Sequence, residues 1–329
     1  MRRVSSMMIS ENSLRYIQQN MQRAARLQEQ IAAEKTILRP SDNPSQVSHV
    51  MAINSTTARN EQYMRNIDDG LAYLNQADSA LATISAMLSD VKEKAIQGAN
   101  GTLGSDDRNA IAEQIDKLID ALVDLGNSSL GGKYLFAGKK NSQPPFYRDP
   151  GTGDVYYRGD TQRVSREIVF GSSYEVDAAG VTAYDALGTG VFGKLADPSD
   201  PANQIDDPLN PGQKMTRVTG GPMEVLAQVR DHLRNDDTEA INKSLEDLDN
   251  AIDVGLVQRV AVGARTRHLE AVKSQLDDQN AKLQQVLSNI QDADFPKLVI
   301  EMSQNDLVYQ ASLSVSSRLL QISLLQYLD

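Results

Sequence analysis

The two end segments of the chain carry apolar residues at the spacing of an α-helix. In the first segment, an arc of about 100° on a helical projection contains Leu14, Ile17, Met21, Ala24 and Ile31. In the second, an arc of about 80° contains Val299, Met302, Tyr309, Leu313, Leu320, Leu324 and Tyr327. Terminal segments usually carry little continuous apolar surface. We therefore predict two terminal helices that are mobile in the free subunit and bury these stripes in an assembly.

Prolines and capping residues divide the segment that follows the first stripe. The first helix is expected to span about 10–38, and the segment 39–44 stops it because that segment contains two prolines. Asn43 is placed to cap the next helix, with Pro44 in its first turn, where a missing N–H costs nothing. This second helix is expected to end near Gly98.

Four further helices are expected beyond residue 100. The first is expected to be capped by Ser105 and terminated by Gly131 and Gly132. Two more are expected over 222–234 and from 238 to about 290, and the last terminal helix begins where Pro296 interrupts the pattern.

The middle of the chain, from about 133 to 221, has a different pattern. Glycine, proline, tyrosine and aspartate are frequent there, and short β-like runs occur at 134–136, 155–157, 167–170 and 174–176. The segment 149–154 is rich in glycine and aspartate and predicts a turn between two strands. We expect a small β-rich domain inserted into a helical hairpin.

A coiled-coil seam follows the insert. Ten of the fifteen positions at alternating spacings of four and three between Ile241 and Ile290 are apolar. We therefore predict a mainly α-helical fold, an elongated antiparallel coiled-coil trunk formed by both chain ends with the β-rich domain inserted. The expected segments are an N-terminal assembly helix (1–44), trunk helices (45–132), the outer β-domain (133–221), trunk helices (222–292) and a C-terminal assembly helix (293–329) that pairs with the first.

Composition narrows the classes of partner. The 44 acidic residues exceed the 33 lysines and arginines, and a net charge of −11 disfavours nucleic acid and anionic lipid. Only 5% of residues are aromatic, which suits thin helical bundles better than a thick globular core. No segment approaches eighteen consecutive apolar residues, so we expect no membrane span.

Candidate chemistry is sparse. The chain has no cysteine, and we find no signal peptide after Met1, so we expect no disulfide and no cleaved export signal. Candidate ligand-binding sites are the three histidines, four loop aspartates and a glycine-rich loop at 188–193. The residues concerned are His49, His232, His268, Asp197, Asp200, Asp206 and Asp207. None has metal-ligand, EF-hand or dinucleotide-loop context. We expect no catalytic residue, no metal, no cofactor and no enzymatic activity.

Several segments together resemble the flagellin superfamily. The proline-flanked turn Pro40, Ser41, Asp42, Asn43 and Pro44 matches a family motif, although Asn43 stands where aspartate is usual. Further matches lie at 60–67, 100–103, 134–138, 157–160, 309–313 and 323–328. The segment from about 181 to 220 matches nothing that we can align.

Within that superfamily, the resemblance is to the proteins that join hook and filament. It implies an extracellular structural ring in the bacterial flagellum, exported through the flagellar type III channel. The implied partners are hook-associated protein 1, flagellin, further copies of the chain, and an export chaperone for the C-terminal helix.

Two alternatives stay open at this point. A flagellin-type filament subunit would share the same helices and polymerise alone into long filaments. A helical signalling or scaffold protein would instead form a stable dimer with its termini folded in solution. The terminal stripes could also close an intramolecular bundle, which is the usual meaning of a helical apolar stripe.

Overall fold

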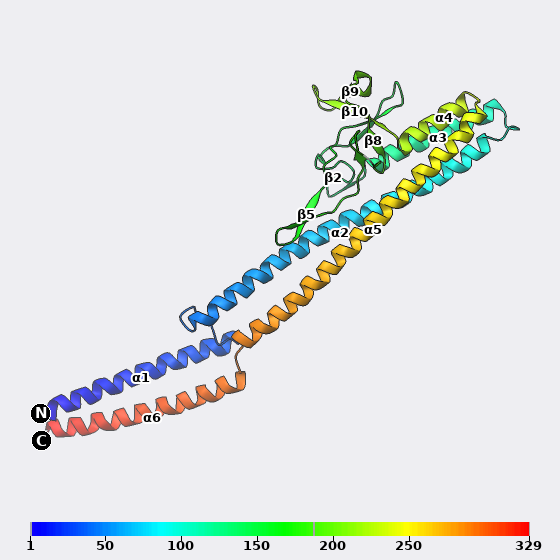
Figure 1. Cartoon of the computed structure of the whole chain (residues 1–329). Coiled ribbons are helices and arrows are strands. Elements are labelled where there is room, and N and C mark those ends of the chain that lie inside the picture. Colours follow the sequence, from blue (N-terminus) through cyan, green and yellow to red (C-terminus); the bar gives the residue numbers. More distant parts are fainter. Residues whose placement is uncertain (1, 187, 329) are drawn as a thin grey trace. The chain divides into compact units, whose positions relative to one another are not determined.

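The computed structural model describes residues 2–186 and 188–328, and the side chains of residues 8, 11–186 and 188–318. Six α-helices account for most of the described chain (Figure 1). They are α1 (Arg2–Ala33), α2 (Pro44–Gly98), α3 (Ser105–Gly126), α4 (Pro222–Arg234), α5 (Thr238–Gln291) and α6 (Phe295–Leu328). The prediction of a mainly helical fold with a β-rich insert is confirmed.

The chain forms two compact units. One contains the residues up to 59 together with those from 277 onward, and the other contains residues 60–276. In the first unit α1 packs against α6, and in the second α3 packs against α4 (Figure 1). The helices α2 and α5 each contribute residues to both units.

The second unit is built on the pairing of α2 with α5. Buried residues recur every seven positions on α5, at Ile241, Leu248, Gly255, Val262, Leu269 and Leu276. Facing them on α2 are Ile67, Leu74, Leu81, Leu88 and Ala95, also seven apart. This heptad spacing confirms the predicted coiled-coil seam within this unit.

Ion pairs account for the two cationic positions of the predicted seam. Lys273 pairs with Asp68 at 2.6 Å, and Arg259 pairs with Asp78 at 3.1 Å. The residue number falls from 273 to 259 on α5 while that of the partner rises from 68 to 78 on α2, so the two helices run antiparallel. The cationic residues in the predicted seam therefore lie at its edge, where their charge reaches an aspartate on the other helix.

Several helix ends differ from the sequence prediction. α1 begins at Arg2 rather than near residue 10. α1 ends at Ala33 rather than near residue 38, because Glu34 takes a left-handed conformation with φ 55°. The amide of Lys35 then donates to the carbonyl of Gln30 at 3.2 Å, an arrangement typical of a helix C-terminus. Ser105 is the first residue of α3 and does not cap it, since Gly104 occupies the N-cap without a side-chain bond.

The predicted terminator of α3 has another role. α3 ends at Gly126, and the side-chain amide of the next residue, Asn127, bonds both to the N–H and to the carbonyl of Phe146. Gly131 and Gly132 instead form the turn between β1 (Ser129–Leu130) and β2 (Lys133–Tyr134). Both glycines have positive φ, 59° and 78°, as the tight turn of a two-residue hairpin requires.

The β-rich insert contains one six-stranded sheet and a separate hairpin. The remaining strands are β3 (Phe146–Arg148), β4 (Val155–Tyr157), β5 (Ser165–Val169), β6 (Ser172–Glu175), β7 (Val181–Thr182), β8 (Gly193–Leu195), β9 (Gln204–Asp206) and β10 (Lys214–Thr219), with a 3-10 turn at Pro201–Asn203. The sheet order is β3-β4-β10-β8-β7, and β9 also pairs with β10. Strands occur at all four predicted runs, and the predicted turn at 149–154 joins β3 to β4.

Aromatic residues form the core between this sheet and the helices. The rings of Phe146 and Phe192 lie 4.7 Å apart, and Phe136 lies 5.0 Å from Phe192. The Tyr157 hydroxyl donates to the Phe136 carbonyl at 2.8 Å. Four of the sixteen aromatic residues thus pack together in this core.

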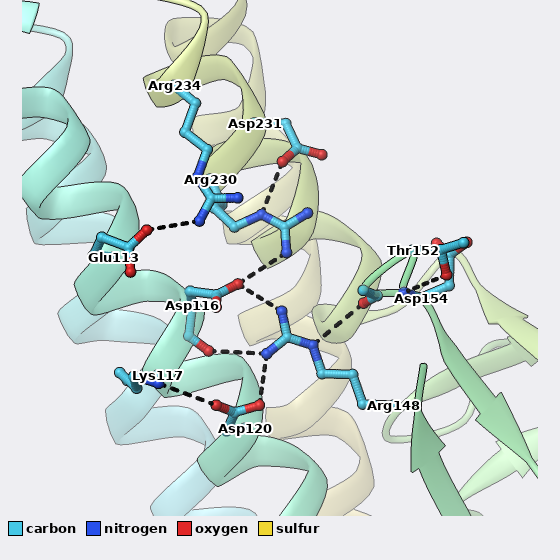
Figure 2. Close-up of polar contacts among 11 residues, drawn as sticks. Glu113, Asp116, Lys117, Asp120, Arg148, Thr152, Asp154, Arg230, Asp231 and Arg234 are labelled. Atoms are coloured by element: carbon cyan, nitrogen blue, oxygen red, sulfur yellow. Dashed lines mark hydrogen bonds and ion pairs between the residues drawn. The ribbon is translucent and has the colours of Figure 1, made fainter. Parts of the chain in front are cut away.

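An ion-pair network fastens the insert to α3 and α4 (Figure 2). Asp116 on α3 accepts from Arg148 of β3 at 2.5 Å and from Arg230 of α4 at 2.9 Å. Arg148 also pairs with Asp120, and Arg230 with Asp231. Burial alone would raise the pKa of Asp116, but the two guanidinium groups outweigh it and hold that pKa below its ordinary value.

Candidate assembly surface of the terminal helices

The two terminal helices are joined by backbone hydrogen bonds where α1 ends and α6 begins. The amide of Ala293 donates to the carbonyl of Glu34 at 3.0 Å, and the amide of Thr36 donates to the carbonyl of Gln291 at 2.7 Å. α6 then starts with Asp294 as its cap, whose carboxylate accepts from the amide of Lys297 at 3.2 Å. These bonds set α1 and α6 as an antiparallel pair (Figure 1).

The seam between α1 and α6 contains both apolar and polar residues. Among the described side chains of the two helices, those classed as buried are Leu27, Leu298 and Asn305. The side-chain amide of Asn305 donates to the carbonyl of Asn20 at 3.1 Å, and the Asn20 side chain donates to the Ser312 hydroxyl at 3.5 Å. Little apolar area is therefore buried where the two helices meet.

The predicted stripe residues divide between this seam and the outside. Ile17, Ile31, Met302 and Tyr309 are half-buried, while Leu14, Met21, Val299 and Leu313 are exposed. The side chains of Leu320, Leu324 and Tyr327 lie outside the described residues. The described stripes thus lie at the margin of the helix pair and are only partly covered by it.

A second apolar stripe lies on α6, away from α1. Its residues are Ile300, Leu307, Val308, Ala311 and Val315, and all of them are exposed. On one side, a polar face consisting of Ser303, Asp306, Gln310 and Ser314 separates it from Leu313 of the first stripe. This outer stripe was not predicted, although its residues fall within about 100° on a helical projection. Apolar side chains are therefore exposed on two faces of α6.

The proline-flanked turn connects α1 to α2 through two side-chain caps. The carboxylate of Asp42 accepts from the amides of Arg39 at 2.8 Å and Leu38 at 3.1 Å. These two bonds hold the pKa of Asp42 below its ordinary value. Asn43 accepts from the amide of Gln46 at 3.3 Å, as the predicted N-cap of α2 should. The motif therefore folds as two consecutive local caps.

The other sequence candidates have local structural roles. Asp197 accepts from the Ser199 amide, Asp200 caps the short turn at Pro201–Asn203, and Asp207 binds Arg158 with both oxygens at 2.6 Å. The ring of His268 stacks on Tyr174. In the part of the chain that the structure describes, no group of histidine, aspartate or glutamate could hold a metal ion. Nor is any described helix long and apolar enough to cross a membrane.

Two family models match this chain and together cover more than half of it. The bacterial flagellin N-terminal helical region matches residues 4–141, and the bacterial flagellin C-terminal helical region matches residues 245–328. The matched regions contain all of α2, α3 and α6 and most of α1 and α5.

Individual relatives match over nearly the whole length. The chain is 24% identical to flagellar hook-associated protein 3 of Escherichia coli over 327 residues, which is 98% of this chain and 99% of the relative. It is 22% identical to the flagellar filament 41 kDa core protein of Borreliella burgdorferi over 311 residues, covering 91% and 90%. The fold is also similar to that of the flagellar junction protein FlgL of Legionella pneumophila, with a TM-score of 0.55, 15% identity, and coverage of 75% of this chain and 100% of that one. The chain belongs to the flagellin family and is a structural protein, not an enzyme.

Proposed function

We propose that this flagellar protein forms the junction ring between the hook and the flagellin filament. The observation that carries the proposal is the alignment with hook-associated protein 3, which extends across 98% of the chain, including the insert. The fold similarity to a flagellar junction protein, with complete coverage of that protein, supports the same role.

Assembly would take place through the terminal helices. The α1–α6 pair leaves Val299, Leu313 and the outer stripe of α6 exposed, and covering one large apolar side chain stabilises by about 1.5–3 kcal/mol. We assign the assembly surface to the first stripe, Leu14, Ile17, Met21, Ile31, Val299, Met302, Tyr309, Leu313, Leu320, Leu324 and Tyr327, and extend it to the outer stripe of α6. Neighbouring copies would supply the covering helices, with hook-associated protein 1 on one side of the ring and flagellin on the other.

Each segment of the chain would then have its own role in the assembly. Residues 1–44 and 293–329 serve as assembly arms, 45–132 and 222–292 form the trunk, and 133–221 form the outer domain. The proline-flanked turn, Pro40 to Pro44, would fix the direction in which the chain passes from the first arm into α2, through the caps of Asp42 and Asn43.

Before assembly the uncovered stripes would need protection. We assign the export of this protein to the flagellar type III channel, and the masking of residues 293–329 to a dedicated chaperone. An exposed apolar face of this length is a risk for premature association. Removal of the residues after Asp294 should abolish chaperone binding in a pull-down. Binding that persists after this truncation would contradict the assignment of residues 293–329 as the chaperone site.

Gold-labelled antibody on intact flagella tests the junction role directly. We expect one narrow band of label between hook and filament in electron micrographs. The similarity to the filament core protein of Borreliella burgdorferi supports a second candidate function, that of a flagellin-type filament subunit. Label along the whole filament would establish that alternative and overturn the junction ring.

A further inference from the structure

The β5–β6 hairpin is held firmly against both long helices of the second unit. The Asn66 side chain on α2 donates to the carbonyl of Glu167 at 2.8 Å, which fixes the first strand. On the second strand, the ring of Tyr174 lies 4.6 Å from the ring of His268 on α5. In Figure 1 the hairpin lies beside α2 at the label β5. Its turn is therefore presented from a fixed base.

That turn carries the most exposed large apolar side chain in the described part of the chain. Phe170 is 80% exposed and follows Val169, which is also exposed. Gly171 has φ 71°, so the turn takes a backbone conformation that favours glycine. Its amide donates to the Glu167 carboxylate at 3.0 Å, which closes the turn. A fixed, exposed aromatic residue is the usual form of an interface anchor.

An apolar patch lies on α5 of the same unit. It consists of Leu256, Val257, Val260, Gly263 and Ala264, and we call it the α5 patch. Val257 is 65% exposed and Val260 is 70% exposed. A Cβ added at Gly263 would meet open space, so a neighbouring side chain could approach the helix closely there. Contiguous exposed apolar residues of this kind mark interaction sites more often than isolated ones do.

The hairpin contacts one side of α5, and the α5 patch is centred on a neighbouring side. The hairpin contacts α5 through Arg265, which pairs with Glu175 at 3.2 Å, and through His268. At 100° per residue, Val260 points about 140° away from Arg265 and about 80° away from His268. Val257 points in nearly the same direction as His268, but it lies about 16 Å away along the helix axis. One copy thus presents two different surfaces, the exposed Phe170 turn and the α5 patch. Two unlike surfaces on one subunit give head-to-tail contacts, which close into a ring when the rotation between copies allows it.

Charge is also complementary between the two surfaces. Arg267 lies seven residues after Val260, on the same face of α5, and is exposed. Among the side chains that the structure describes, none forms an ion pair with Arg267. The exposed carboxylate of Glu167 lies beside Phe170 at the hairpin turn. Opposite charges beside two apolar surfaces fix their register more than they add affinity.

We propose that the Phe170 turn of one copy docks on the α5 patch of the next copy, with Glu167 facing Arg267. The occupant of the patch is thus a second copy of this chain. The proposal rests on the proposed function, because it requires several copies to lie side by side in one flagellum.

Disulfide crosslinking in isolated flagella tests this contact, since the chain has no cysteine of its own. Ser172→Cys beside the turn and Ala264→Cys in the patch are combined in one chain, which leaves Phe170 in place. After oxidation, we expect a ladder of covalent dimers and longer products on a non-reducing gel. The matched control replaces Ala264→Cys by Ala86→Cys, an exposed alanine on α2, and should give no ladder.

Further variants show whether the anchor and the charge pair are responsible. In the Ser172→Cys, Ala264→Cys chain, Phe170→Ala should remove the ladder. Arg267→Glu should weaken it, because Glu167 of the docked copy would then face a like charge. Either single-cysteine variant should stay monomeric, because the contact is between unlike surfaces.

Some outcomes would overturn the contact without touching the junction role. A doubly substituted chain that is incorporated into flagella, as seen by antibody label, yet forms no ladder would refute the docking of Phe170. Dimers from Ser172→Cys alone would replace it by a symmetric contact between two hairpins. If the label instead ran along the filament while the ladder persisted, the junction role would fail and the contact between copies would stand.

Discussion

The side-chain amide of Asn305 on α6 donates to the backbone carbonyl of Asn20 on α1, across a seam where helix pairs usually bury leucine. Asn305 is almost fully buried, and its bond joins residues 285 positions apart in the chain. A polar residue in such a seam typically specifies register and lowers stability. We infer that this bond sets how α1 and α6 align before neighbouring copies cover them.

The first prediction concerns that alignment. Asn305→Leu should loosen the register of the pair, because a leucine packs equally well in neighbouring alignments. The contact of Asn20 with Ser312 reports on it, since Asn20→Cys and Ser312→Cys should form an intrachain disulfide in assembled flagella. Asn305→Leu should lower the yield of this disulfide.

The control for this experiment is Gln304→Leu. It adds the same side chain at the adjacent, exposed position of α6 and should leave the disulfide yield unchanged. Equal disulfide yields from the parent chain, the Asn305→Leu chain and the Gln304→Leu chain would show that Asn305 does not fix the register.

A second prediction separates an assembly protein from a closed helical bundle. Because the α1–α6 seam buries few apolar side chains, limited proteolysis of the free subunit should remove about forty residues from each end first. A core near residues 45–290 should persist, and mass spectrometry of the fragments gives its ends. Assembled flagella should resist under the same conditions. Termini that survive in the free subunit would favour a signalling or scaffold protein.

A third prediction concerns pH and the network around Asp116. Since the folded-state pKa of Asp116 is lowered, its ion pairs stabilise the fold above the unfolded-state pKa, near 4. That stability is lost as pH falls through the lower folded-state pKa. Asp116→Asn should cost about 1–3 kcal/mol of unfolding free energy at pH 7, because Arg148 and Arg230 both lose a largely buried partner.

The measurement is denaturant unfolding of the wild type and the variant at pH 7 and at pH 3. The cost of Asp116→Asn should shrink at the lower pH. Asp90→Asn is the matched control, since Asp90 pairs with Lys94 at 3.6 Å on an exposed helix face and should cost less than about 1 kcal/mol. A cost for Asp116→Asn that does not change with pH would contradict the role of its charge.

The helices were predictable from sequence because each is determined mostly by neighbours three and four residues away. The start of α4 at Pro222, the cap of α2 at Asn43 and the seven-residue repeat of α5 all follow from such local patterns. The left-handed Glu34 was not predictable, since glutamate is an uncommon residue in that conformation.

The sheet was harder to predict because its strands are short and their partners are distant. β10 lies at its centre, yet it occurs in the segment that matched nothing. Thr216 pairs with Tyr157, and Val218 pairs with Leu195. The same reason applies to Arg148, whose partner Asp116 lies 32 residues away on another element. In the candidate surface, the first stripe was found by its spacing, and the outer stripe was missed because one apolar arc had already been assigned to α6.

The last prediction tests the outer stripe of α6 against the first. Leu307 is 66% exposed and belongs to the outer stripe, so Leu307→Asp should leave the folding of the free subunit unchanged. In the assembly, an unpaired carboxylate would be buried without a partner, which costs several kcal/mol unless it is protonated. We therefore expect loss of motility and of the antibody band, with the protein secreted into the medium. Leu313→Asp, in the first stripe, should have the same effect.

The matched control is Gln310→Asp, which places the same charge on the polar face of α6 between the two stripes. It should allow assembly, and circular dichroism of all three purified variants should show equal helix content. Wild-type motility with Leu307→Asp would mean that the outer stripe faces solvent in the flagellum. If Gln310→Asp blocked assembly as completely as Leu307→Asp, the whole circumference of α6 would be covered, and the stripes would not be the specific contact surfaces.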